Sequence, residues 1–289
     1  MKYSEEFQAL ISSTLENYIG HGNPNAKILF LGQEGASEPD AAIEVDGRND
    51  YIRSIKENRE DWNGNIQDEA GYESMALACT PETLKNFNPL FPYKGQKFSY
   101  RRRSGKKDEH GNYIYHGAKG SAPTWCTYQK LINKILERLS TERKPMTKED
   151  DLDFHRYSFH TDMSAVASRK HNHDQKELAA QSVLKRVSLL SNEFFRKFPI
   201  VIAAVGHFPR NTYGDEYFGK IFGVEFLGNE EIESGKWINI SIRKDNARPM
   251  LLIHTPQFSA AISDRHLDQI AKRLVDFAKE HKINLMPEE

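Results

Sequence analysis

The stretch K-I-L-F-L-G-Q-E-G, residues 27–35, decides how this chain folds. Its apolar run is too short for a helix and breaks abruptly at the polar pair Gln33 and Glu34, as is typical of a strand buried on both faces of a parallel sheet. Residues 250–259, M-L-L-I-H-T-P-Q-F-S, show the same pattern, and His254 closes the apolar run. In open α/β sheets the ligand crevice lies at the carboxyl ends of the strands. We therefore expect Gln33, Glu34 and His254 to converge on one pocket.

The flanking apolar runs predict alternating helices and strands. We expect helices over 4–19, 124–140, 174–198 and from Ser263 onward, strands over 27–31, 154–160, 199–206 and 250–254, and a β-hairpin from 222–228 and 237–243. This alternation predicts an α/β fold of three layers, with helices on both faces of a central four-stranded parallel sheet. We expect one domain over 1–289, with a large insertion at about 40–120 that carries short helices, for example near 68–86.

The composition excludes several classes of protein. The 289 residues include 40 Lys plus Arg and 41 Asp plus Glu, so the near-zero net charge gives no overall attraction to nucleic acid or membrane. Cys79 and Cys126 are too few for a disulfide framework, a cysteine-based zinc site or a four-cysteine iron–sulfur cluster. The sequence shows no signal peptide and no apolar stretch long enough to cross a bilayer. We expect a cytoplasmic protein with no membrane contact.

The element order and the two strand-end motifs resemble the uracil-DNA glycosylase superfamily. Residues 32–34 are similar to a Gly-Gln-Asp motif whose acid activates water, and residues 254–259 are similar to a second motif that begins His-Pro-Ser and ends Leu-Ser. The resemblance implies that Glu34 and His254 are catalytic. It also implies hydrolysis of the N-glycosidic bond of a damaged base, such as uracil, in DNA. We expect no cofactor, no metal and no obligatory protein partner.

The same resemblance assigns roles to other residues. Phe98 matches a ring that stacks on the flipped base, and His160 stands where the family often places an Asn that reads the base edge. Phe258 takes the place of a Leu that wedges into the vacated stack. The resemblance thus implies base binding by Gln33, Phe98, His160 and Ser259, and DNA contact by Phe258.

A basic segment, residues 94–107, adds a separate indication of nucleic-acid binding. It contains Arg101, Arg102, Arg103 and Lys106 and no acidic residue, and aromatic residues are interleaved with the cations. Such a segment beside the pocket is expected to follow a phosphate backbone.

The chemistry that these residues suggest is base excision. Cleavage of an N-glycosidic bond builds positive charge on the sugar and negative charge on the departing base. A carboxylate such as Glu34 orients water and stabilises the cation, while His254 or a backbone N–H steadies the leaving base. Flipping a base out of the duplex costs a few kcal/mol, and stacking on a ring such as Phe98 recovers about 1–3 kcal/mol.

Departures from the family pattern leave other interpretations open. Glu34 replaces Asp, residues 35–36 replace a Pro-Tyr pair that bars thymine, and His160 is not Asn. Two alternatives to the glycosylase therefore stay open: an inactive protein of the same fold that binds nucleic acid or a nucleotide-like ligand, and an unrelated small-molecule hydrolase on a doubly wound sheet. A metal site at His171 and His173 is a further alternative. The sequence offers no third well-spaced ligand for it.

Each candidate residue also has a structural interpretation. Glu34 is suited to capping a helix or to an ion pair, and His254 to bonding the backbone at a strand end. Phe98 is suited to anchoring a loop and Phe258 to the core. The remaining candidates are ambiguous in the same way: His160 and Asp162 suit pocket lining or capping, and the basic segment suits a solvated surface.

Overall fold

The structure is a computed structural model that describes residues 3–33, 55–67, 88–92, 97–98, 102–111, 113–116, 123–139, 145–165, 173–214, 216–245, 247–260 and 262–287. The strands are β1 (His21–Gly22), β2 (Ile28–Gly32), β3 (Arg102–Lys107), β4 (Tyr113–His116), β5 (Ser158–Asp162), β6 (Ile200–Ala203), β7 (Glu225–Glu233), β8 (Lys236–Arg243) and β9 (Met250–His254). The helices are α1 (Glu5–Ser12), α3 (Asn58–Gln67), α5 (Pro123–Arg138), α6 (His173–Leu190), α7 (Glu193–Arg196), α8 (Phe208–Tyr213), α9 (Tyr217–Phe222) and α10 (Asp264–Glu280), with a 3-10 turn at Phe154–Arg156.

One mixed sheet organises the described part of the chain. Its seven strands lie in the order β1-β5-β2-β6-β9-β8-β7. The four central strands β5, β2, β6 and β9 are parallel, and β1, β8 and β7 pair antiparallel at the two edges. The predicted α/β class with a parallel core is therefore confirmed. The sheet is wider than predicted, because the hairpin β7–β8 pairs with β9 and continues the sheet.

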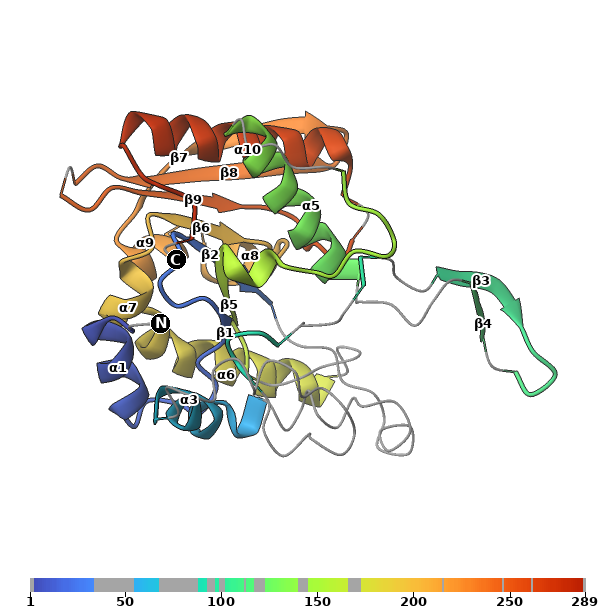
Figure 1. The fold of residues 1–289 in the computed structure, drawn as a ribbon, viewed down its shortest axis with the longest axis horizontal. Coiled ribbons are helices and arrows are strands. Elements are labelled where there is room, and N and C mark those ends of the chain that lie inside the picture. The colour runs from blue at the N-terminus through green and yellow to red at the C-terminus, as the bar shows by residue number, and fades with distance from the viewer. Residues whose placement is uncertain are drawn as a thin grey trace.

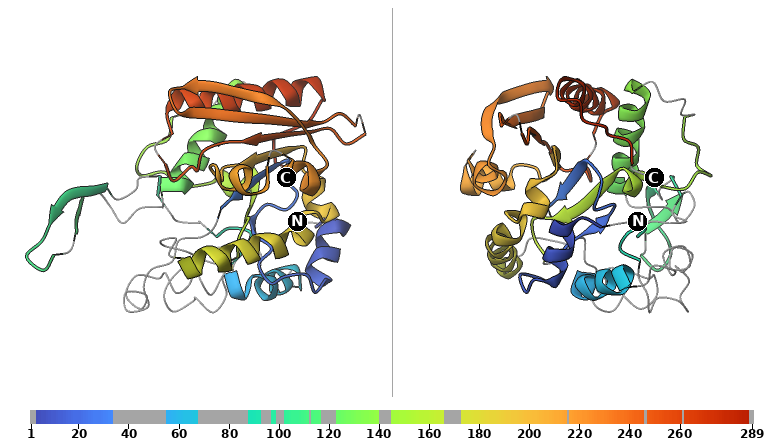
Figure 2. Two further views of the ribbon diagram at one scale, coloured as in Figure 1. Left: turned by 180° about the vertical axis from the view of Figure 1, so that it is seen from behind. Right: turned by 60° about the vertical axis from the view of Figure 1, so that its left-hand side comes forward.

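Helices cover both faces of this sheet (Figures 1 and 2). Alternate residues of each core strand face opposite sides, as the period of a strand requires. Phe30 and Ile253 pack in the cluster that α5 and α10 cover, whereas Leu31 and Leu252 pack in the cluster that α1, α6, α7 and α9 cover. Both clusters are continuous and buried, so the core strands are apolar on each face. This is the reason that residues 28–31 and 250–253 form unbroken apolar runs.

The predicted helix 4–19 is shorter than expected. It begins after Ser4, whose hydroxyl accepts a hydrogen bond from the Phe7 amide (3.3 Å), and ends at Ser12. The Ser13 hydroxyl donates to the Leu10 carbonyl (2.7 Å) and so replaces a bond that a longer helix would make. Ser12 and Ser13 therefore end the helix, although the apolar residues Leu15 and Ile19 that follow have helical spacing.

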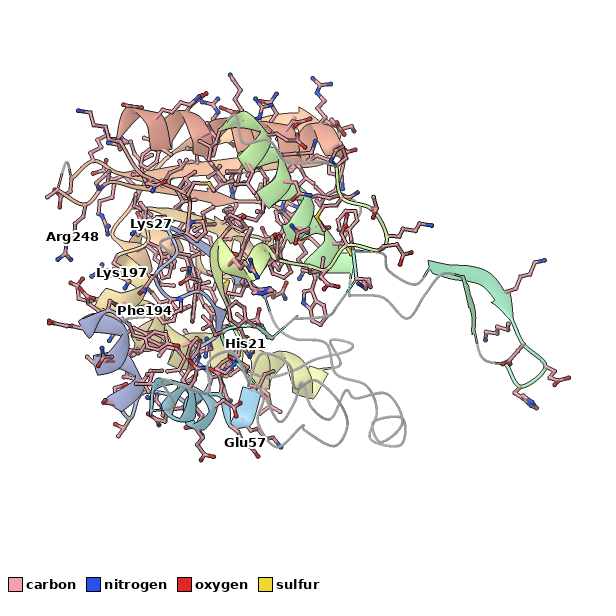
Figure 3. All side chains as sticks on the ribbon, viewed as in Figure 1. His21, Lys27, Glu57, Phe194, Lys197 and Arg248 are labelled. Carbon is pink, nitrogen blue, oxygen red and sulfur yellow. The ribbon has the colours of Figure 1, made fainter. Side chains whose placement is uncertain are left out.

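The predicted helix 174–198 is divided into α6 and α7. Asn192 interrupts it and caps α7 by accepting a hydrogen bond from the Phe194 amide (3.0 Å). The ammonium of Lys197 lies 4.9 Å from the centre of the Phe194 ring, beside α1 (Figure 3). The cap directs the chain so that the aromatic residues of α7 enter the core.

Other boundaries also differ from the sequence analysis. The strand expected over 154–160 begins later, because residues 154–156 form the 3-10 turn and the strand runs over 158–162. The helices α8 and α9 and the hairpin β3–β4 were not predicted, and the helix expected near 68–86 lies outside the described residues. Strand 250–254 and the helix capped by Ser263 are confirmed. Of the described helices, none combines the length and apolar character that crossing a membrane requires.

Candidate functional site at the carboxyl edge of the sheet

The carboxyl ends of the four parallel strands meet along one edge of the sheet, here called the rim. It comprises the residues that end or follow each core strand: Gly32–Gln33, Asp162–Met163, Ala204–Gly206 and His254–Gln257. The connection after β2 leads to β5 on one side, and the connection after β6 leads to β9 on the other side. In open α/β sheets the crevice for a ligand forms where successive connections diverge in this way. The rim between β2 and β6 is therefore the place for a site.

The two strand-end segments are in direct contact across the rim. The side-chain amide of Gln257 donates a hydrogen bond to the side-chain oxygen of Gln33. The backbone of Gln33 is fixed in turn, because its carbonyl accepts from the Ser164 amide (2.9 Å). Gly206 lies beneath Gln257 with a positive φ of 66°, a conformation that glycine adopts without strain. The ends of β2, β5, β6 and β9 are thus joined into one surface.

His254 is held by hydrogen bonds on both ring nitrogens. Its Nε2–H donates to the Gly206 carbonyl (2.6 Å), which only accepts. Its Nδ1 consequently accepts from the Asn239 amide (3.2 Å), and Asn229 donates to the Asn239 oxygen (2.7 Å). These partners assign a neutral imidazole to His254. The ring is buried, and its bond to the Gly206 carbonyl fixes the backbone just beyond the end of β6.

The hollow beside the His254 ring is small. It is lined by Arg210, Gly214, Phe218, Phe226, Asn239, Ser241 and His254. Its volume is about 10 Å³, which is near the minimum for one water molecule. The ring centres of Phe218 and Trp237 lie 5.2 and 4.9 Å from that of His254. A base does not fit in this hollow as the structure shows it.

His160 faces the other side of the sheet from His254. Its Nε2 donates to the Ser158 hydroxyl (2.8 Å), because that hydroxyl itself donates to the Phe154 carbonyl (2.7 Å). The ring stacks on Phe30, with centres 5.0 Å apart. Burial, with smaller contributions from His155 and His21, holds the pKa of His160 well below its usual range. His160 is therefore a neutral histidine of the core, which is the structural interpretation of this residue.

Asp162 is a rim carboxylate to which the sequence analysis gave no definite role. It ends β5 directly opposite Gly32 and is partly exposed. A β-carbon at position 32 would collide with its Oδ1, so only glycine permits this approach. The Tyr18 hydroxyl donates to its Oδ2 (3.3 Å), and the fully buried Arg186 donates to its backbone carbonyl (2.8 Å). The sequence did contain a signal for Asp162, because an acidic residue here follows closely after the strand expected over 154–160.

Phe98 is a partly buried ring that packs against the cluster beneath α5 and α10. Its amide donates to the Asp150 carbonyl (2.9 Å), and its carbonyl accepts from the thiol of Cys126 (2.8 Å). The adjacent Lys97 forms an ion pair with Asp151 (2.7 Å). These contacts hold the segment around Phe98 against the body of the protein.

Phe258 of the second motif was considered both as a wedge and as a core residue. Its ring is 1% exposed and packs beside Tyr128, with ring centres 5.5 Å apart. Burial of this apolar ring stabilises the core, and contact of Phe258 with DNA stays a prediction. The neighbouring Ser259 is exposed.

The remaining predicted residues lie apart from the rim or outside the described chain. Glu34 and Arg101 are outside the described residues. Arg102 and Arg103 belong to β3, and Lys106 is an exposed residue of the same strand. The ribbon formed by β3 and β4 extends away from the main sheet (Figure 1).

No metal centre is formed by the described residues, since no three His, Cys, Asp or Glu side chains among them are grouped to hold an ion. His171 lies outside those residues, and of His173 only the backbone is described.

Comparison with known proteins adds no closer identification. No protein-family model, no curated protein and no solved structure matches this chain. The class that the structure itself defines is an α/β protein with a mixed sheet around a parallel core.

Proposed function

We propose that this chain is a DNA glycosylase-like hydrolase with a three-layer fold of the uracil-DNA glycosylase type. One observation carries the proposal: the hydrogen bond between Gln33 and Gln257 joins the two strand-end motifs at the rim. These motifs lie at opposite ends of the sequence, and the family resemblance rests on both of them. The rim is also the edge of the sheet at which α/β proteins place their ligands.

In this proposal the residues at and beside the rim have different roles in catalysis, positioning and base contact. Glu34, which follows Gln33 in the sequence, orients the water that attacks the sugar and stabilises the positive charge. His254 is a positioning residue, because its Nε2–H is donated to the Gly206 carbonyl. It holds Gly206 under Gln257 and so keeps the two motifs in register. Phe98 and Ser259 remain the candidates for contact with the base, and the substrate is DNA with a damaged base.

The experiment is a screen for base release. Oligonucleotides that carry uracil, hypoxanthine, and oxidised or alkylated bases, in single and double strands, are incubated with the protein. Free base and alkali-labile abasic sites are then measured. Release from at least one substrate supports the proposal. Absence of release from the whole panel, with a protein that is folded by circular dichroism, contradicts it.

A second candidate function is binding of nucleic acid without catalysis. It is favoured by the β3–β4 ribbon, whose first strand has the sequence R-R-S-G-K-K and extends from the body (Figure 1). The major groove of a duplex accommodates a two-stranded ribbon of this kind, and phosphate contacts give salt-dependent affinity. Replacing Arg102 and Arg103 by Ala should lower affinity for all sequences and flatten the salt dependence. A matched pair on α10, Lys272→Ala with Lys279→Ala, should change neither.

A further inference from the structure

A row of polar side chains crosses three neighbouring strands on one face of the sheet and ends at the rim. Asn229 on β7, Asn239 on β8 and His254 on β9 stand opposite one another in the register of these strands. Asn239 and His254 are buried, whereas Asn229 is exposed. A buried amide beside a buried imidazole is costly unless both are hydrogen-bonded. The bonds within the row therefore decide what it does.

The hydrogen bonds of the row run in one consistent direction. Asn229 donates to the side-chain oxygen of Asn239 (2.7 Å), and the Asn239 amide donates to Nδ1 of His254 (3.2 Å). Nε2–H of His254 donates to the Gly206 carbonyl (2.6 Å), which only accepts. A ring with a proton on both nitrogens would need the oxygen of Asn239 at Nδ1, but that oxygen accepts from Asn229. The row thus supplies the donor that a neutral imidazole requires.

The charged and titratable neighbours of the ring act in the same direction. Arg210 lines the hollow beside His254 together with Asn239, and a nearby cation opposes a positive charge on a buried ring. The ring of Trp237 lies 4.9 Å from that of His254, and its indole donates to the exposed His207 (3.3 Å). Protonation of His207 would add a second cation to this region. An uncharged donor such as the Asn239 amide is the partner that suits these surroundings.

Gly206 connects the row to the two strand-end motifs. Its amide donates to the Thr255 carbonyl (3.1 Å), and a β-carbon at its position would lie 3.5 Å from the Gln257 side chain. Gln257 in turn donates to Gln33. The row, Gly206 and the two glutamines therefore form one path of contacts from β7 to the end of β2. A change in the bonds of the His254 ring alters the support beneath both motifs.

From these observations we propose that Asn239 is a positioning residue of the rim. Its amide keeps the His254 ring neutral and directed at the Gly206 carbonyl. That bond holds the backbone over which Gln257 meets Gln33. The inference rests on the proposed function in one respect, namely that the rim is the site. It gives the hairpin β7–β8 a part in that site, because the row begins on both of its strands.

The first test is the protonation state of His254 in wild type, read at pH 7 from the ring nitrogen chemical shifts by nuclear magnetic resonance. We expect a proton on Nε2 and none on Nδ1. A proton on Nδ1, with or without one on Nε2, overturns the inference. The measurement needs no variant and no catalysis, so its result does not depend on whether the protein releases bases.

The second test uses Asn239→Asp, which keeps the shape of the side chain but replaces the donor at Nδ1 by an anionic acceptor. The carboxylate should draw a proton to the ring, so the titration midpoint of His254 should rise by at least about one pH unit. Asn229→Ala, at an exposed position, should give a smaller rise because the Asn239 amide loses the partner that orients it. Ser241→Ala is the matched control, since Ser241 is buried on the same strand and lines the same hollow. Its midpoint should equal that of wild type.

The side-chain amide signals of Gln257 report the positioning itself. They should move in Asn239→Asp by more than in Ser241→Ala, and thermal unfolding shows whether each variant is folded. Movement of both the His254 titration and the Gln257 signals supports the inference. If either stays as in wild type in a folded Asn239→Asp protein, the inference is overturned, even if wild type releases bases. Failure of the proposed function appears separately, as absence of base release in the oligonucleotide screen.

Discussion

The side-chain amide of Gln257 donates a hydrogen bond to the side-chain oxygen of Gln33, a residue 224 positions earlier in the chain. The strands that precede these residues, β9 and β2, are separated in the sheet by β6. The contact therefore spans the end of β6 and closes the rim over Gly206. It is the most direct structural link between the two motifs.

This contact should be measurable as a coupling between the two residues. A double-mutant cycle of Gln33→Ala and Gln257→Ala, followed by urea unfolding, should give a coupling free energy of about 1 kcal/mol. The matched cycle pairs Gln33→Ala with Gln8→Ala, since Gln8 on α1 donates to the carbonyl of Tyr3, which precedes that helix. We expect that pair to be additive. Additivity of the first pair as well would show that the amides do not interact in solution.

The close approach of Asp162 to Gly32 predicts a steric penalty that depends on the carboxylate. Gly32→Ala should lower the free energy of unfolding by about 1–3 kcal/mol, because the added methyl group meets Oδ1. Asp162→Ala in the same chain should remove most of this penalty. Gly64→Ala in α3 is the control, because nothing lies within 4 Å of a β-carbon there. That substitution should be neutral or stabilising by up to about 1 kcal/mol. If Gly32→Ala is equally harmless, the carboxylate does not occupy the place described.

Arg186 is a buried charge, and its replacement should lower the free energy of unfolding strongly. It is fully buried and bonds to Glu16 (2.9 Å), to the Tyr18 carbonyl (2.7 Å), to Thr161 and to the Asp162 carbonyl. Arg186→Met should cost about 3–5 kcal/mol, because it leaves the partly buried Glu16 carboxylate and the other acceptors without their donor.

The matched substitution for Arg186→Met is Arg273→Met. Arg273 forms an ion pair with Glu230 at the surface, with 47% of its side chain exposed. Such pairs contribute about 1 kcal/mol or less. Chemical denaturation of both variants checks the contrast, and equal losses would contradict the role assigned to Arg186.

His266 should make stability depend on pH. Burial lowers its pKa from 6.5 to about 4, with Lys236 acting in the same direction and Glu233 opposing it. The unfolded chain takes up a proton near pH 6.5, and the folded chain does so only near pH 4. The contribution of His266 to stability is therefore complete above pH 6.5 and is lost as the pH falls toward 4, by about 1.4 kcal/mol per pH unit.

Urea unfolding of wild type and His266→Gln at pH 7.5 and pH 5 tests this dependence. Between these values wild type should lose roughly 2 kcal/mol more than the variant. The exposed His110→Gln is the control and should lose as much as wild type. A parallel loss in all three proteins would show that His266 does not set the slope.

Much of the fold was predictable because the core strands carry a strong local signal. Residues 28–31 and 250–253 are apolar at every position, as a strand with two buried faces requires, and the strands β2 and β9 that contain them are both neighbours of β6 in the parallel core. The helix after Ser263 was predictable from its cap and its apolar stripe. Such signals depend only on a few adjacent residues.

The errors arose where distant residues decide the local structure. The sequence of β8 shows alternation but not its partner, so its pairing with β9 was missed. The sequence left Phe258 open between a wedge and the core, because the rings of Phe30 and Tyr128 that surround it come from distant parts of the chain. Asp162 was undecided because the importance of its position depends on the absence of a side chain at Gly32, on another strand. Contacts of this kind are set by the tertiary fold.

The central claim is that the joined strand-end motifs form one site that removes a base with the help of Glu34. The most direct measurement is the single-turnover rate of base release by wild type, Glu34→Gln and the exposed control Glu280→Gln, on the best substrate of the lesion panel. Glu34→Gln should be slower by about 100- to 10,000-fold, the typical contribution of a catalytic carboxylate, while Glu280→Gln should match wild type. Equal rates for all three folded proteins, or the absence of release by wild type, would contradict the central claim.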